Sequence, residues 1–150
     1  MNFIRGEAGW SVSIGLLEQG VSRLGVLHQP LDEYTVAGGA GLGVTVNGVA
    51  AKPLRSADPS RLVLGIGLHP TISVKAKLTV LRFATEDLGA SPRFCGSSTQ
   101  SFLNILKGET DGYLALGDAT WDVAAALPIL QELGAINTVD WSGHDMQDKL

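Results

Sequence analysis

The chain has 150 residues, 45% of them hydrophobic and 17% charged, and a formal net charge of −4 at pH 7. This composition supplies enough apolar side chains for a hydrophobic core and excludes an intrinsically disordered protein. The acidic balance, with Lys and Arg scattered singly, provides no basic surface for nucleic acid or for an anionic membrane.

The sequence encodes neither a membrane-spanning helix nor a disulfide framework. No segment reaches the roughly 18 apolar residues that a membrane helix needs, and residues 1–6 lack the apolar run of a secretion signal. The one cysteine, Cys95, allows no intramolecular disulfide and favours a reducing, cytoplasmic setting. We therefore expect a single domain over residues 1–150, without a leader of its own.

The first fifty residues predict an antiparallel meander. Residues 10–17 alternate apolar with small side chains, and residues 21–28 follow a tight turn, so these two strands should pair antiparallel. Residues 33–37 predict a third strand, and residues 44–46 a fourth that ends at Asn47-Gly48, a strong hairpin signal.

A glycine run, residues 38–43, separates the third strand from the fourth and should interrupt regular structure. It lacks the spacing of a nucleotide-binding loop, because no alignment satisfies G-x-G-x-x-G and no Gly-Lys-Ser/Thr follows. A flexible turn is the expected structure.

The second half predicts strands that alternate with helices, the pattern of parallel βαβ units. Residues 62–68 form a continuous apolar run, which is typical of a strand buried on both faces. The segments expected after it are a helix within 71–89, a strand at 93–95, a helix at 98–106, a strand at 113–116, a helix at 120–133 and a strand at 136–141. The predicted class is α/β, with a mixed sheet in which the antiparallel meander is followed by βαβ units.

The segment Gly96-Ser97-Ser98-Thr99 lies between a predicted strand and a predicted helix start, where several main-chain N–H groups lack helical partners. Together with the hydroxyl groups and the helix dipole, these N–H groups form a plausible seat for a phosphate. The alternative, which the sequence alone favours, is that Ser98 or Thr99 only caps the helix.

Asp122 lies in the first turn of the helix predicted at 120–133, where the helix dipole favours a carboxylate without any further role. One carboxylate cannot hold Mg²⁺ tightly, because that ion takes octahedral oxygen ligands. Taken by itself, Asp122 is therefore a helix-start residue.

The remaining reactive residues form no motif. His28, His69 and His144 have no metal-ligand spacing, so each is expected at the surface or hydrogen-bonded. Cys95 has no adjacent base and lies in a predicted strand, which favours a buried thiol. No G-x-S-x-G nucleophile elbow occurs.

The segment W-D-V-A-A-A-L-P-I-L at residues 121–130, followed by Gly134-Ala135, resembles the C-terminal signature of the inositol monophosphatase family, W-D-x-A with small and then apolar positions and a Gly-Gly or Gly-Ala pair. Residues 111–117 resemble the family's D-x-Y-x-x-x-G strand, and Gly96-Ser97-Ser98 stands at its Gly-Ser-Ala-like loop. Residues 10–30 resemble its S-I-A-L…G-V-V-Y-x-P hairpin. The resemblance spans nearly all of the chain.

The resemblance implies a layered α/β sandwich that removes phosphate from small monoesters, namely sugar, inositol or nucleotide phosphates, with Mg²⁺. It implies that Asp122 is a metal ligand and that Gly96, Ser97 and Ser98 contact the substrate or its phosphate. Family members commonly dimerise, which implies a homo-oligomer.

The departures from the family pattern change the expected activity. The family's D-P-[IL]-D-G-T metal motif should immediately precede Asn2-Phe3, and its glutamate ligand lies earlier still, whereas this sequence starts with Met1 at the threonine position. Ala115 stands where inositol-specific members carry a glutamate that binds sugar hydroxyls, and Trp141-Ser142-Gly143 resembles the family's D-x-x-G turn, without its final strand and helix.

Two classes of function follow from these departures. The chain is either the C-terminal half of a phosphatase whose N-terminal half is missing or supplied elsewhere, or a non-catalytic binding or assembly module that keeps an anion pocket. In both cases Asp122 is the one retained ligand, no catalytic residue is assigned, and the chain alone should be inactive, with weak or no Mg²⁺ binding. Val12, Ile14, Leu16 and residues 62–68 should form an exposed apolar face that favours self-association.

Overall fold

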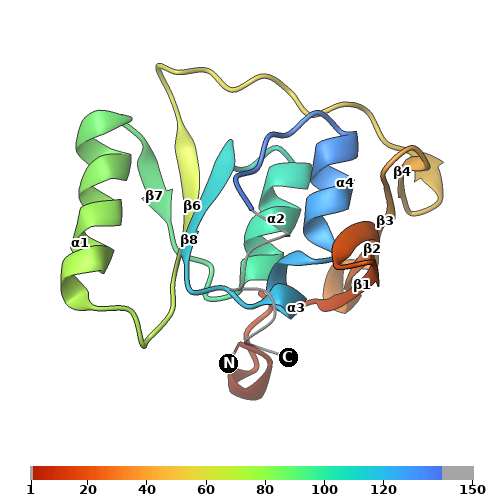
Figure 1. The fold of residues 1–150 in the computed structure, drawn as a ribbon, viewed down its shortest axis with the longest axis horizontal. Helices are drawn as coiled ribbons and strands as arrows, with labels where there is room; N and C mark the ends of the chain where they lie inside the picture. The colour runs from red at the N-terminus through yellow and green to blue at the C-terminus, as the bar shows by residue number, and fades with distance from the viewer. Residues whose placement is uncertain (1, 140–150) are drawn as a thin grey trace. The chain divides into compact units, whose positions relative to one another are not determined.

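The computed structural model describes residues 2–139, which form two compact units (Figure 1). The first unit combines the N-terminal segment up to Gly9 with Arg55–Asp118, and the second combines Trp10–Leu54 with the chain from Ala119 onward. The α/β class predicted from the sequence is confirmed. The antiparallel and the parallel strands form separate sheets, one in each unit, because no hydrogen-bonded pair among the described strands joins the two sets.

The second unit is built on a five-stranded antiparallel sheet with the order β1-β2-β3-β4-β5, so the predicted meander is confirmed. Its strands are β1 (Val12–Glu18), β2 (Val21–Gln29), β3 (Tyr34–Gly39), β4 (Gly43–Val46) and β5 (Val49–Ala50). The hairpin between β4 and β5 turns at Asn47 and Gly48, which both have positive φ. A short 3₁₀ turn, η2 (Pro30–Asp32), connects β2 to β3.

The glycine run is more regular than predicted. Its first two residues belong to β3 and its last to β4, so residues 40–42 alone form the turn. The carboxylate of Glu132 accepts hydrogen bonds from the main-chain N–H groups of Gly41, at 2.9 Å, and Gly43, at 3.2 Å. The Glu132 carboxylate therefore holds this turn in place.

One face of this sheet is covered by α4 (Ala126–Glu132), which packs on β2, β3 and β4. The prediction of one helix over 120–133 is wrong, because α3 (Thr120–Val123) ends before α4 begins. Pro128 accounts for the break, since its ring excludes the carbonyl group four residues earlier, that of Ala124, from helical bonding. The buried Ser22 hydroxyl donates a hydrogen bond to this freed carbonyl group.

At the helix break the backbone lies close to the sheet. Gly15 on β1 faces Ala124, and Gly25 on β2 faces Ala125. A Cβ atom added at Gly25 would lie 2.7 Å from the Cα atom of Ala125 and closer still to its carbonyl oxygen. Small residues are therefore required on both sides of this contact, and the fully buried side chains of Leu27, Val36 and Ile129 form the core of the unit.

The opposite face of the sheet is apolar and exposed to solvent at β1. Val12, Ile14 and Leu16 alternate with Gly15, which faces Ala124, and their exposed fractions are 43%, 62% and 58%. Among the strands that the structure describes, β1 pairs with β2 alone and is an edge strand. This part of the predicted apolar face is confirmed as exposed.

The first unit contains a parallel sheet with the order β7-β6-β8, which confirms the predicted parallel pairing. Its elements are β6 (Val63–Leu68), α1 (Val74–Arg82), the π-helical turn η3 (Phe83–Asp87), β7 (Ser91–Arg93), α2 (Ser98–Leu106) and β8 (Gly112–Leu116). The helices α1 and α2 lie on opposite faces of β6 (Figure 1). Leu64 and Ile66 pack with Ala84 and Ala90 on the α1 side, whereas Gly65 faces α2. This strand is therefore covered on both faces, so the prediction that residues 62–68 add to an exposed apolar surface is wrong for its centre.

Several predicted bounds differ from the structure. The helix at 98–106 is confirmed, whereas the strand predicted at 93–95 ends at Arg93. Residues 136–139 form no strand, because they make no ladder with the described strands, and the remainder of that prediction and the Trp141-Ser142-Gly143 turn lie outside the described residues. The chain begins with a 3₁₀ turn, η1 (Phe3–Arg5), and between residues 2 and 139 no helix is both long and apolar enough to span a bilayer.

Candidate functional site

The loop Gly96-Ser97-Ser98 lies in the first unit, between β7 and α2. Gly96 has φ +67°, in the left-handed region that favours glycine. Ser97 is the N-cap of α2, and its side-chain oxygen accepts a hydrogen bond from the N–H group of Gln100 at 3.3 Å. The expectation that Ser98 or Thr99 caps the helix is wrong, because both already have helical positions.

The cap leaves two donors unused. The carbonyl group of Ser97 accepts a hydrogen bond from the N–H group of Ser101 at 3.1 Å. The main-chain N–H groups of Ser98 and Thr99 have no acceptor among the residues that the structure describes. Unpaired N–H groups at the positive end of a helix dipole are favourable for an anion. The geometry of this loop is therefore compatible with a bound phosphate.

Tyr113 on β8 reaches the same loop. Its hydroxyl oxygen lies 3.1 Å from Oγ of Ser98 and 3.0 Å from Oδ2 of Asp118. Its ring packs edge-on against Phe102 of α2, with the ring centroids 5.1 Å apart. The residues predicted for the site do not include Tyr113 or Asp118.

The N-terminal segment supports the loop from its other end. The side-chain amide of Asn2 donates hydrogen bonds to the carbonyl groups of Gly9, at 2.6 Å, and Cys95, at 3.0 Å. Cys95 follows β7 and its side chain is half-buried, so the prediction of a fully buried strand thiol is wrong. Its sulfur accepts a hydrogen bond from the amide of Asn104 at 3.2 Å.

Asp122 belongs to the second unit and lies in the first turn of α3. Its Oδ2 atom accepts a hydrogen bond from the N–H group of Ala119 at 3.0 Å, which closes the start of the helix. The helix-start role predicted for this residue is therefore confirmed. Within the described chain its other oxygen, Oδ1, has no hydrogen-bond partner and can bind a further ligand.

The described residues do not assemble a magnesium site. Mg²⁺ takes octahedral oxygen ligands, commonly one or two carboxylates together with substrate phosphates and water. Across residues 2–139 no three His, Cys, Asp or Glu side chains converge as a metal-binding group. His28 and His69 are each hydrogen-bonded through Nδ1 to a threonine hydroxyl at 2.8 Å, and His144 lies outside the described residues. Asp122 thus offers one oxygen, and a complete site requires further donors.

Asp111, at the start of the D-x-Y segment, has a structural role. Its side chain is 3% exposed and lies 2.8 Å from the Arg55 guanidinium. Its second oxygen accepts a hydrogen bond from the N–H group of Val63 at 2.9 Å, so the carboxylate ties the start of β6 to that of β8.

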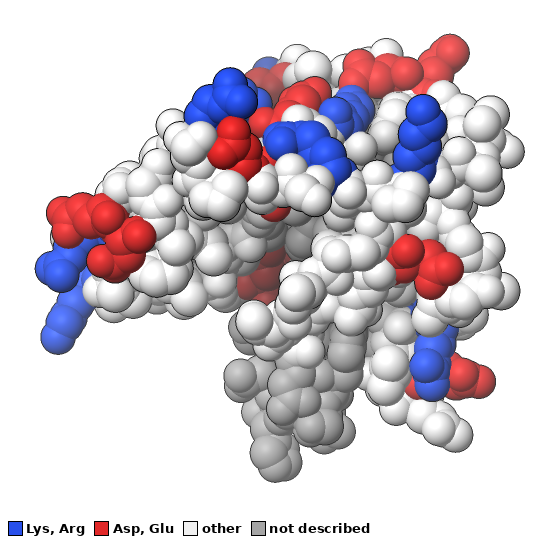
Figure 2. Space-filling view, turned by 90° about the horizontal axis from the view of Figure 1, so that it is seen from above, with Lys and Arg blue, Asp and Glu red and all other residues white. Residues whose placement is uncertain are grey.

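Elsewhere, the face shown in Figure 2 carries acidic and basic side chains intermixed, without a continuous basic patch.

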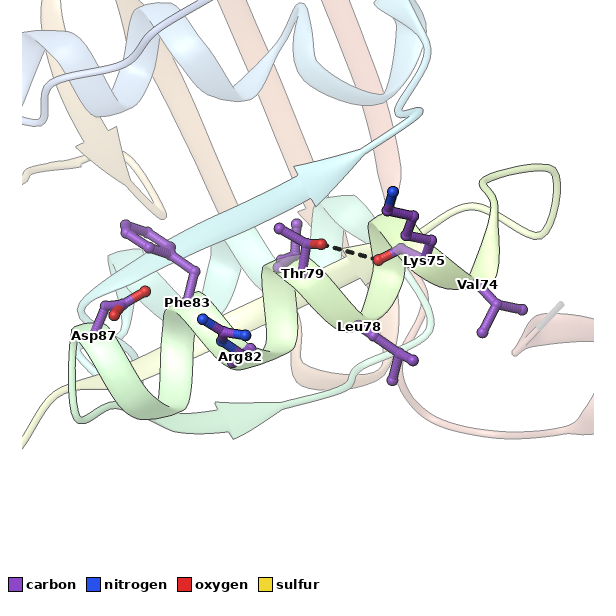
Figure 3. Close-up of a pocket in the computed structure, with 8 residues that line it drawn as sticks. Val74, Lys75, Leu78, Thr79, Arg82, Phe83 and Asp87 are labelled. Atoms are coloured by element: carbon purple, nitrogen blue, oxygen red, sulfur yellow. Dashed lines mark hydrogen bonds between the residues drawn. The ribbon is translucent and has the colours of Figure 1, made fainter.

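A separate hollow of about 810 Å³ lies along α1 and η3 of the first unit (Figure 3). It is lined by Val74, Lys75, Leu78, Thr79, Val80, Arg82, Phe83 and Asp87. None of the predicted site residues lines it, and α1 lies on the opposite face of β6 from α2. The hollow is therefore distinct from the loop.

Comparison with known proteins identifies the family. The model of the inositol monophosphatase family matches residues 1–149. The inositol-1-monophosphatase of Bacillus subtilis is 25% identical over 139 residues, which cover 92% of this chain and 52% of that protein. The fructose-1,6-bisphosphatase/inositol-1-monophosphatase of Aquifex aeolicus is 26% identical over 140 residues, covering 92% and 53%.

A solved structure agrees with these matches. The inositol monophosphatase from Anabaena is 30% identical, with a TM-score of 0.71 over 89% of this chain and 53% of that one. The chain thus spans about half the length of the relatives it matches. It belongs to the inositol monophosphatase family.

Proposed function

We propose that this chain supplies the phosphate-binding part of a Mg²⁺-dependent phosphomonoesterase that acts on small sugar, inositol or nucleotide phosphates. The observation that carries the proposal is the pair of N–H groups at the start of α2 that have no acceptor within residues 2–139, in a chain matched by the family model over residues 1–149. The names of the two relatives, which specify inositol monophosphate and fructose bisphosphate as substrates, support this substrate class. In this proposal the two units work together as one domain, in a reducing, cytoplasmic setting.

Each predicted site residue has a role in this proposal. Gly96 turns the chain so that Ser97 and Ser98 present their main-chain N–H groups to the substrate phosphate. Asp122 would hold Mg²⁺ through its carboxylate, and the ion would supply Lewis-acid activation. Since the described residues bring no second metal ligand to it, the other donors must come from elsewhere.

We predict that the 150-residue chain by itself has no phosphatase activity, because one carboxylate cannot position the metal and the attacking water. The measurement is phosphate release from inositol monophosphate, fructose bisphosphate and an aryl phosphate with Mg²⁺ present. Turnover near about 1 s⁻¹ or faster, within the usual enzyme range, would contradict the prediction.

Thermal melting provides the control for metal binding. A site that binds Mg²⁺ with a Kd of roughly 10 mM raises the free energy of unfolding by about 0.2 kcal/mol at about 5 mM Mg²⁺, which corresponds to an increase in Tm of about 1 °C. A shift of many degrees that Asp122→Asn abolishes would show that further carboxylates complete the site.

A second candidate function is a non-catalytic binding module that keeps the anion loop. No group of three potential metal ligands converges among residues 2–139, and this favours the non-catalytic binding module. Phosphate-ester binding without hydrolysis, even when the chain is mixed with a family member's N-terminal half, would support this function. Hydrolysis restored by that half would support the phosphatase.

We also propose that the chain associates with a second copy through β1. Its unpaired edge and the exposed Ile14 and Leu16 side chains favour strand pairing between copies. Sedimentation should show concentration-dependent association, and Ile14→Lys should weaken it at least about tenfold, a charge in an apolar contact costing more than about 1.4 kcal/mol. Leu42→Lys, in the exposed turn of the same sheet, is the control. A clean monomer at high concentration would argue instead for a complementary half as the partner.

A further inference from the structure

The turn between β4 and β5 is formed by Asn47 and Gly48, which are both exposed and have φ +48° and +80°. The main-chain N–H group of Asn47 donates a hydrogen bond to the carbonyl group of Thr35 at 2.8 Å. The side-chain Oδ1 atom of Asn47 accepts a hydrogen bond from the N–H group of Thr35 at 2.7 Å. The Asn47 side chain therefore continues the ladder between β3 and β4 by one residue, and the proposed function does not use this contact.

The same two residues form a reactive pair. The main-chain nitrogen of the residue after an asparagine can attack the side-chain Cγ atom, and glycine hinders this attack least because it has no Cβ atom. The chain has four asparagines, and Asn47 is the one that glycine follows. Asn104, in contrast, is 6% exposed and precedes the branched Ile105 in α2.

We propose that Asn47 is a site of spontaneous deamidation and that the β4–β5 hairpin controls its rate. The Gly48 nitrogen forms a bond to Cγ of Asn47, the bond from Cγ to Nδ2 breaks, and Nδ2 leaves as ammonia with the hydrogen from the Gly48 nitrogen. Water then opens the cyclic imide. Opening at Cγ gives aspartate, and opening at the main-chain carbonyl carbon gives isoaspartate, in which the main chain runs through Cγ. Water is the co-reactant, and no atom is oxidised or reduced.

The folded hairpin opposes the first step. Ring closure requires rotation about the bond from Cα to the carbonyl carbon of Asn47, which takes this residue out of the turn, and the side chain must leave the Thr35 N–H group. One hydrogen bond of ordinary strength corresponds to a factor of up to about ten. Since two hydrogen bonds join Asn47 to Thr35, deamidation should be at least about tenfold slower in the folded chain than in the unfolded chain.

The two products should differ in their effect on the hairpin. Aspartate keeps an oxygen that accepts the Thr35 hydrogen bond, so the variant Asn47→Asp should retain the Tm of the parent chain within about 2 °C. Isoaspartate adds a carbon atom to the main chain of a two-residue turn, and the strand register of such a hairpin depends on the length of its loop. The isoaspartyl chain should therefore lose the protection of the Thr35 amide against hydrogen exchange.

The test is peptide mapping by mass spectrometry of the 150-residue chain after incubation at mildly alkaline pH, folded and in urea. We expect conversion of Asn47 in both samples, at least about tenfold faster in urea, while the other three asparagines stay unchanged over the same time. Gly48→Ala should slow the reaction in urea, because its methyl group hinders the attacking nitrogen.

A variant of the folded chain tests the control by the hairpin. Val46 pairs with Val49 beside the turn, and Val46→Ala should speed deamidation of the folded chain about 2- to 5-fold, the effect expected for one cross-strand pair. Hydrogen exchange of the Thr35 amide should rise by the same factor. Val74→Ala, which changes an exposed valine of the first unit, is the matched control and should alter neither rate.

Each result decides one part of the proposal. If Asn47 does not convert in urea, the modification site is overturned. Equal rates in the folded and unfolded chains overturn the control by the hairpin, as does faster Thr35 exchange in Val46→Ala without faster deamidation. If Val46→Ala does not fold, the comparison of the parent chain with and without urea still decides.

Discussion

Replacing Gly25 by alanine is expected to lower the free energy of unfolding by about 3 kcal/mol or more, the upper range for overpacked sites. The added methyl group would overlap the backbone of Ala125, which has no flexible side chain to move aside. The backbone between α3 and α4 cannot easily shift away from β2, because the Ser22 hydroxyl donates a hydrogen bond to the Ala124 carbonyl group and α4 packs on β2. Urea denaturation followed by circular dichroism measures the loss.

Gly112→Ala is the matched control for this substitution. Gly112 also lies in a strand, and the one neighbour of an added Cβ is the end of the Leu64 side chain at 3.1 Å, which can rotate. A cost below about 1 kcal/mol is expected there. Similar midpoints for the two alanine variants would show that the contact between β2 and the helix break is looser than the structure indicates.

Asp111→Ala is expected to cost about 2–3 kcal/mol, since it removes charge-assisted hydrogen bonds to a nearly buried carboxylate. The Val63 N–H group would lose its acceptor, and the Arg55 guanidinium would lose its carboxylate partner and keep its hydrogen bond to the Gly108 carbonyl group. Asp111→Asn keeps one oxygen acceptor and should cost less. The same urea titration measures all three proteins.

An exposed carboxylate provides the comparison for Asp111. Asp58 pairs with Arg61 at 3.1 Å, and the two side chains are 44% and 84% exposed. Asp58→Ala should therefore cost less than about 1 kcal/mol. If the two alanine variants lose equal stability, burial of Asp111 contributes nothing beyond an ordinary surface pair.

The sequence predicts those elements whose boundaries are encoded locally. The bounds of α2 are correct, because Gly108 has the positive φ that ends a helix and Ser98 opens an apolar periodic segment. The division between α3 and α4 was missed because it depends on Ser22, which satisfies the Ala124 carbonyl group from 102 residues away. No local pattern contains that contact.

The candidate site shows the same limit. The position of Gly96, Ser97 and Ser98 before a helix is a local signal that favours a cap, whereas their phosphate role follows from the family resemblance and stays a prediction. The contact between Tyr113 and Ser98 is not predicted, because the pattern of residues 62–68 indicates only an apolar strand. The alternating glycines in that run were the available signal, since two missing side chains on one face of a strand mark a close approach.

The dependence of the antiparallel sheet on α4 has a consequence during synthesis on the ribosome. Strands β1 to β5 are synthesised before α4, whose last residue, Glu132, follows the end of β5 at Ala50 by 82 residues. At about 5–20 residues per second, the sheet stays without its covering helix for roughly 4–16 s. Throughout that interval Leu27 and Val36, which are fully buried in the folded chain, lack the helix that covers their face of the sheet. We expect the yield of the folded chain to depend on chaperone supply more than the stability of the finished fold suggests.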